Sequence, residues 1–209
     1  MIFSNDLSVL LLGMPKTGTH SAREALKDHA LVVAEAGKHP IAFDSVLLAR
    51  EKGYFPEYPI AKVYAIWRDP VERFKSAFAH MKKTNPDFFF KKFPEKFVGI
   101  DFVKGQPVSN EFIQAINSIT TTEIFPYVLI ERIELFKPQK FWLKDHVVTC
   151  LPFSDYDNSM RIIFNEMGVD NTIPIPKLNV SDGTYDVTLT AEEEQNIRNF
   201  YRDDYYYQS

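Results

Sequence analysis

Short apolar runs alternate with helical periodicities in the first half of the chain. The runs at 9–12 and 62–67 are rich in β-branched, leucine and aromatic residues, which predicts buried strands, and a shorter strand is expected at 31–34. Helices are expected near 19–28 and 42–52 and from Pro70 onward. This alternation predicts the α/β class, with a central parallel sheet flanked by helices and right-handed crossovers.

The helix expected from Pro70 has two distinct stripes. A core stripe repeats every three or four residues and consists of Val71, Phe74, Phe78 and Met81. A second, polar stripe consists of Arg73, Ser76, His80 and Lys83. Further along, a helix is expected near 156–167, and Thr190 with Glu193 forms a capping box for a last helix.

The segment from 10 to 21, LLLGMPKTGTHS, carries the most chemistry. An apolar strand runs into a loop and then into a helix, whose first N–H groups and dipole favour an anion. The amides of Gly18, Thr19 and His20 are therefore placed to hold a phosphate, and Lys16 adds a full positive charge. The alternative is a tight strand-to-helix turn that binds no ligand.

The position of Lys16 separates this loop from the nucleoside-triphosphate loop G-x-x-x-x-G-K-[ST], because Lys16 precedes Gly18 by two residues. With Thr17, Thr19 and Ser21 around it, the loop resembles the 5′-phosphosulfate loop of the sulfotransferases. One departure is His20, where that family usually has Thr or Ser.

A second motif begins where the strand at 62–67 ends. Arg68 follows this strand, at the edge of an α/β sheet where ligands bind, and Asp69-Pro70 is typical of a helix start. The run RDPVERFKSAF resembles the sulfotransferase segment R-(D/N)-P-x-x-R-x-x-S-x-(Y/F). The resemblance implies that Arg68 and Ser76 bind a 3′-phosphate; the alternative is a solvated helix face.

The two motifs together resemble the sulfotransferases that use 3′-phosphoadenosine 5′-phosphosulfate (PAPS), and weaker similarities to their carbohydrate-type branch follow at 138–143, 177–181 and 200–205. The resemblance implies a three-layer fold of the P-loop nucleotide-binding type. It implies a catalytic Lys16 and a cofactor site formed by Lys16, Thr17, Gly18, Thr19, His20, Ser21, Arg68 and Ser76, without a metal ion.

Transfer to an acceptor hydroxyl or amine also needs a base that takes the proton. His39 is the first candidate because it lies between the second strand and the next helix, at the expected ligand edge of the sheet. Glu35 is the alternate. Two other functions stay open, namely a P-loop kinase or NTPase and a nucleotide-binding protein of the same fold without turnover.

Composition indicates the number of domains, the cellular location and the class of partner, but not the reaction. The 209 residues, 45% of them hydrophobic, suit a single domain, and no linker or repeat divides the chain. A single cysteine, the lack of a signal-like N-terminus and the lack of a long apolar stretch favour the cytoplasm, without a membrane partner. No basic stripe typical of nucleic-acid binding is present, so the expected partner is a small-molecule or carbohydrate acceptor.

Charge and aromatic residues are unevenly distributed. Residues 1–110 carry 16 Lys and Arg against 12 Asp and Glu, whereas residues 111–209 carry 8 against 16, an asymmetry that suits an anionic cofactor held by the first half. Between 84 and 97, five phenylalanines lie among three lysines. This segment is either a flap that binds the acceptor or part of the core.

Overall fold

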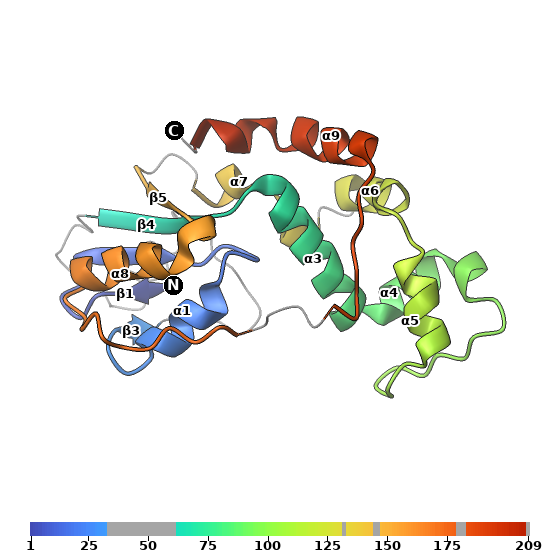
Figure 1. Ribbon diagram of the computed structural model, residues 1–209, viewed down its shortest axis with the longest axis horizontal. Coiled ribbons are helices and arrows are strands. Elements are labelled where there is room, and N and C mark those ends of the chain that lie inside the picture. The colour runs from blue at the N-terminus through green and yellow to red at the C-terminus, as the bar shows by residue number, and fades with distance from the viewer. Residues whose placement is uncertain (33–61, 131–132, 144–146, 179–182, 208–209) are drawn as a thin grey trace. The chain divides into compact units, whose positions relative to one another are not determined.

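The computed structural model describes residues 1–32, 62–130, 133–143, 147–178 and 183–207 (Figure 1). The chain forms two compact units. Unit 1 comprises residues 1–70, 138–179 and 201–209, and unit 2 comprises residues 71–137 and 180–200. The expectation of one domain over the whole chain stays a prediction.

Unit 1 is built on an open mixed sheet, which confirms the α/β class. Within the described residues the sheet has five strands in the order β3-β1-β2-β4-β5. Parallel pairing joins β2 to β4 and β4 to β5, and antiparallel pairing joins β1 to β2 and β3. The strands are β1 (Ile2–Phe3), β2 (Val9–Leu12), β3 (Leu31–Val32), β4 (Lys62–Trp67) and β5 (Thr149–Pro152).

The expectation of a parallel sheet is wrong at β1, an antiparallel strand that the sequence did not predict. A five-residue turn joins β1 to β2, closed by bonds from Ser4 N to Val9 O (3.0 Å) and from Leu7 N to Ser4 O (2.9 Å). Such a short link joins only antiparallel strands, since a parallel pair needs a crossover of a dozen or more residues. β1 therefore lies inverted between β2 and β3, and the other four strands run in one direction.

Alternating side chains of the central strands supply two separate cores. On one face, Val9, Leu11 and Ile66 pack with residues of α1 (Thr19–Leu26) and α8 (Tyr156–Glu166). On the other face, Leu10, Leu12, Ala65 and Trp67 pack with Trp142 and Leu143 of α7 (Gln139–Leu143). The remaining helical elements of unit 1 are η3 (Phe153–Asp155) and η4 (Arg202–Tyr207).

Unit 2 is helical in its described part. Its elements are α3 (Pro70–Thr84, whose first residue ends unit 1), α4 (Pro86–Lys92), η1 (Pro94–Phe97), α5 (Asn110–Asn117), α6 (Thr121–Ile130), η2 (Glu134–Phe136) and α9 (Ala191–Phe200). The core is made largely of phenylalanine rings, with centroids 5.0 Å apart for Phe74–Phe136 and 4.7 Å for Phe97–Phe112.

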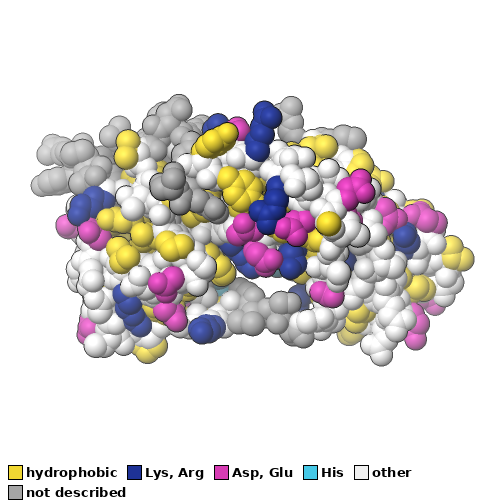
Figure 2. All heavy atoms as spheres, turned by 45° about the horizontal axis from the view of Figure 1, so that its top comes forward, with side chains coloured by type: hydrophobic (Ala, Val, Ile, Leu, Met, Phe, Trp, Pro, Cys, Tyr) yellow, Lys and Arg dark blue, Asp and Glu magenta, His cyan; other side chains and the backbone are white. Residues whose placement is uncertain are grey.

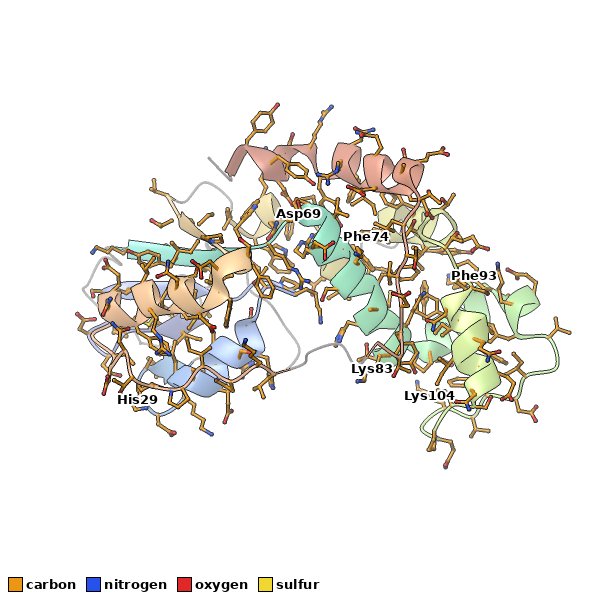
Figure 3. All side chains as sticks on the ribbon, in the orientation of Figure 1. His29, Asp69, Phe74, Lys83, Phe93 and Lys104 are labelled. Carbon is orange, nitrogen blue, oxygen red and sulfur yellow. The ribbon has the colours of Figure 1, made fainter. Side chains whose placement is uncertain are left out.

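The phenylalanine-rich segment belongs to this core rather than to an exposed flap. Phe89, Phe93 and Phe97 are each no more than 5% exposed. Phe74 and Phe93, labelled in Figure 3, are two of the buried rings. The core stripe predicted on α3 is also confirmed, because all four of its members are buried.

Acidic and basic side chains of the described residues are interspersed on the face shown in Figure 2. None of the described helices is long and apolar enough to cross a membrane.

Candidate functional site

The loop between β2 and α1 is a tight turn closed by its own side chains. The hydroxyls of Thr17 and Thr19 both donate to the carbonyl oxygen of Met14, at 3.1 and 2.8 Å. Two residues adopt left-handed backbone conformations, Lys16 at φ 65° and Gly18 at φ 80°. A lysine in this conformation is strained, and such strain is found preferentially at functional sites.

Gly18 precedes α1 directly, and two constraints require glycine there. Its positive φ disfavours any side chain, and an added Cβ would lie 2.5 Å from Cε2 of Tyr156. The Tyr156 hydroxyl donates to the Gly18 carbonyl at 2.8 Å. Burial raises the pKa of Tyr156 well above its usual value, so the hydroxyl stays a donor. The first residue of α8 thus holds the loop.

Tyr156 was missed by the sequence analysis. It lies 138 residues from Gly18 along the chain, and no motif links the two. Only the fold, which places the start of α8 beside this loop, reveals the contact.

Lys16 and Arg68 are neighbours in unit 1, and each carries a positive charge. Arg68 Nη1 donates to the carbonyl oxygen of Lys16 at 3.2 Å, and the Arg68 guanidinium lies 4.6 Å from the centroid of the Phe153 ring. Burial lowers the pKa of Lys16, and the neighbouring positive charge of Arg68 lowers it further. Two cations held together in this way favour an anion beside them.

The remaining loop residues occupy different environments. His20, in the first turn of α1, is exposed. Ser21 is buried, and its hydroxyl oxygen accepts a bond from the backbone N–H of Leu178 at 3.1 Å. Ser21 is thus used at least in part to anchor the segment at 177–178, where the sequence showed one of its weaker similarities to sulfotransferases.

The second motif divides between the two units. Arg68 belongs to unit 1, whereas Arg73 and Ser76 lie on α3 in unit 2. Ser76 is half-buried. Arg73 is fully buried instead of lying on a polar stripe, because its guanidinium donates to the carbonyls of Leu135 (3.2 Å) and Lys137 (2.7 Å).

The two candidates for the base, His39 and Glu35, lie outside the described residues. Their roles stay predictions from the sequence.

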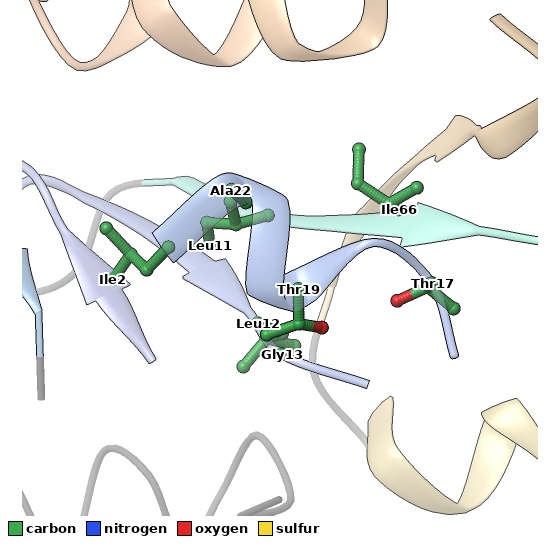
Figure 4. Close-up of a pocket in the computed structure, with 8 residues that line it drawn as sticks. All are labelled: Ile2, Leu11, Leu12, Gly13, Thr17, Thr19, Ala22 and Ile66. Carbon is green, nitrogen blue, oxygen red and sulfur yellow. The ribbon is translucent and has the colours of Figure 1, made fainter. Parts of the chain in front are cut away.

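A cavity behind the loop, shown in Figure 4, is too small for a nucleotide. Its volume is about 10 Å³, about the space of one water molecule. It is lined by Ile2, Leu11, Leu12, Gly13, Thr17, Thr19, Ala22 and Ile66. Gly13 is packed tightly here, since an added Cβ would lie 2.7 Å from Cγ2 of Thr19. The candidate anion site is therefore the loop and its two cations, not this cavity.

Comparison with known proteins adds no family to this geometry: no protein-family model and no curated protein matches the chain.

Proposed function

We propose that this protein is a sulfotransferase that moves a sulfuryl group from PAPS to an acceptor hydroxyl or amine. The observation that carries the proposal is the bond from Arg68 to the Lys16 carbonyl. The two residues come from the two motifs that resemble the sulfotransferase cofactor segments. They are 52 residues apart in the sequence, and their contact is what a single ligand spanning both motifs requires.

The charges of the loop suit the cofactor proposed. Lys16 and Arg68 are both half-buried, and they lie next to the helix start that follows Gly18. A ligand with phosphate groups at both ends of a nucleoside would offset the repulsion between these cations. The proposal extends to the fold: the sheet, with helices packed on both of its faces, is proposed to belong to the P-loop nucleotide-binding type.

When bound, PAPS supplies the sulfuryl group. In the proposed step the acceptor oxygen or nitrogen forms a bond to sulfur, and the bond from sulfur to the phosphate oxygen breaks. Lys16 stabilises the negative charge that develops on this departing oxygen, as fixed cations do in phosphoryl transfer. The acceptor proton passes to His39 or, alternatively, to Glu35, as proposed from the sequence. We propose a small-molecule or carbohydrate acceptor and a cytoplasmic location.

The decisive experiment is calorimetric binding of adenosine 3′,5′-bisphosphate, AMP, ADP and ATP. The wild-type protein should bind the bisphosphate far more tightly than the other three. Arg68→Ala should weaken bisphosphate binding roughly 10- to 150-fold, the cost of one charge-assisted hydrogen bond. AMP binding should hardly change. Ser76→Ala should reduce the same preference, an expectation that rests on the motif alone.

Arg161→Ala is a matched control in the same unit. Arg161 also donates to a carbonyl, that of Ile173 at 2.7 Å, and also lies over a ring, that of Phe164. Removing it should leave nucleotide preference unchanged. Equal affinity for ATP and the bisphosphate would indicate a kinase or NTPase. Bisphosphate binding without sulfuryl transfer to any acceptor, followed by mass spectrometry, would indicate a non-catalytic nucleotide-binding protein.

A further inference from the structure

The backbone of Arg68 lies just beyond the hydrogen-bonded ladder of the sheet. On one side, β2 pairs with β4 up to Leu12 and Ala65; on the other, β5 pairs with β4 up to Pro152 and Trp67. Arg68 follows Trp67, the last residue of β4, and lies beyond the last residues of β4 that pair with β2 and β5. Arg68 is half-buried as a residue, and its backbone N–H and C=O groups find partners outside the strands.

The side chain of Gln139 supplies both partners. Its Oε1 accepts from the Arg68 N–H at 3.0 Å, and its Nε2 donates to the Arg68 carbonyl at 2.7 Å. The amide orientation follows from the partners, since the N–H group requires an oxygen and the carbonyl requires an NH₂ group. Gln139 is fully buried. Its side chain therefore replaces a missing strand and fixes the backbone from which the Arg68 guanidinium projects.

Gln139 is itself held by the last helical element of unit 1. Asp204, also fully buried, accepts from the backbone N–H of Gln139 (2.8 Å) and from that of Lys140 (3.0 Å). These N–H groups lie at the start of α7, where backbone donors have no partner within the helix. The Asp204 carboxylate thus fixes the first turn of α7 and, with it, the origin of the Gln139 side chain.

We propose that Gln139, anchored by Asp204, is a positioning residue that sets the direction of the Arg68 guanidinium and thereby the preference for the 3′-phosphate. The identity of the ligand in this inference rests on the proposed function. The hydrogen bonds that join Asp204, Gln139 and Arg68 are independent of that function. The guanidinium contacts the Lys16 carbonyl oxygen at 3.2 Å and lies 4.6 Å from the centroid of the Phe153 ring, and it does so from the backbone that Gln139 holds on both sides. A Gln139 that only stabilises α7 would leave this preference unchanged.

The test compares Gln139→Met, which keeps length and burial but loses both bonds, with Ser4→Ala. Ser4 is a matched control, because it is buried in the same unit and its hydroxyl accepts from the Val9 N–H at 3.0 Å. Val9 starts β2, at the end of the strand opposite to the loop. Both variants lose buried hydrogen bonds, so a decrease in stability alone does not distinguish them.

Gln139→Met should reduce the preference for bisphosphate over AMP about tenfold, because a displaced guanidinium loses most of one charge-assisted contact. Ser4→Ala should leave the preference unchanged. In an Arg68→Ala background, Gln139→Met should cause no further loss, since it acts through Arg68. An unchanged preference in Gln139→Met, or an equal additional loss in the Arg68→Ala background, would overturn the proposal.

Amide hydrogen exchange measured by NMR provides a readout that needs no ligand. Exchange at the Arg68 N–H should accelerate in Gln139→Met relative to wild type, and it should stay slow in Ser4→Ala. A wild-type protein without bisphosphate preference would refute the proposed function, and the exchange result would still decide whether Gln139 holds Arg68. Unaltered exchange in Gln139→Met refutes the positioning role whatever the ligand.

Discussion

Two arginines that lie five residues apart in one motif, Arg68 and Arg73, differ in burial and in the groups that their guanidinium groups contact. Arg68 is half-buried, and its guanidinium lies beside Lys16, a second cation. Arg73 is fully buried, and its guanidinium donates to two carbonyls of the segment that contains η2. The first arrangement places a charge where an anion is favoured, whereas the second uses the charge to hold the fold. A motif alone therefore does not distinguish a binding arginine from a structural one.

Two lysines, Lys16 in unit 1 and Lys82 in unit 2, differ in the same way in their burial and in the partners of their ammonium groups. Lys16 is half-buried in unit 1, and within the described residues its ammonium has no hydrogen-bond or ion-pair partner. Lys82, in unit 2, is 1% exposed. Its ammonium donates to the carbonyl of Asp186 at 3.1 Å and lies 4.5 Å from the centroid of the Phe78 ring. The Lys82 ammonium thus has partners within unit 2, whereas the charge that acts on the Lys16 ammonium is a second cation, Arg68.

The largest expected effect is on turnover. Lys16→Ala should reduce sulfuryl transfer roughly 100- to 1,000-fold, the cost of removing one group that stabilises developing charge. Bisphosphate affinity should fall less, because the lysine charge matters most when the oxygen departs. Steady-state kinetics and calorimetry measure the two effects. The control is Lys27→Ala, which removes an exposed lysine from the end of α1 that pairs with Glu24. Full activity in Lys16→Ala would show that the Lys16 ammonium does not stabilise the departing oxygen.

Arg73→Met tests whether Arg73 stabilises the fold rather than binding a ligand. The variant leaves two carbonyls without their charged donor and should lower the free energy of unfolding by about 3 kcal/mol. The preference for bisphosphate over AMP, measured on the folded variant, should stay close to that of wild type. Urea unfolding and calorimetry provide the two numbers. A stable variant that loses the preference would show that Arg73 is a ligand-binding residue after all.

The sequence was sufficient where a local pattern determines a local structure. Strands β2 and β4 have the predicted bounds, and α3 begins at the predicted Pro70. The capping box of α9 is confirmed, because the Glu193 N–H donates to Thr190 Oγ1 and the Thr190 N–H to Glu193 Oε2. In each case the determining residues are neighbours along the chain.

The sequence was insufficient where partners are distant. Strand β1 has only two residues, too few for any periodicity. The contacts of Tyr156 with Gly18 and of Gln139 with Arg68 join residues 138 and 71 positions apart. The burial of Arg73 depends on carbonyls more than 60 residues away, so the helical pattern placed it wrongly on a polar stripe.

A smaller effect concerns a carboxylate that serves two helices in unit 2. Burial alone would raise the pKa of Glu193, but hydrogen bonds from Thr121, Thr190 and Thr122 lower it to about 2. Because its pKa is lower in the folded than in the unfolded state, Glu193 stabilises the fold above pH 4.5. This contribution, about 2 kcal/mol, is lost as the pH falls from 4.5 toward 2.

Glu193→Gln should remove this part of the pH dependence. Urea unfolding between pH 3 and 7 would show the variant losing less stability than wild type as the pH falls. The control is Glu194→Gln, next in sequence, whose carboxylate pairs with Arg198 on the surface of α9. Identical pH profiles for wild type and Glu193→Gln would mean that the threonine bonds do not favour the ionised carboxylate.

The smallest expected effect is on the pH dependence of stability, and it comes from the buried Lys82. Burial lowers the pKa of Lys82 to about 8, although the nearby Asp186 carboxylate raises it in part. The unfolded chain, with an ordinary lysine pKa of 10.5, binds more protons between pH 8 and 10.5, so the wild-type fold gains stability as the pH rises through this window. The gain is about 1–2 kcal/mol. Lys82→Met should lack it, whereas Lys83→Met, at an exposed neighbour, should retain it. Urea unfolding at pH 7–10 measures the difference in stability between Lys82→Met and wild type. A constant difference across that range would show that burial does not lower the pKa of Lys82.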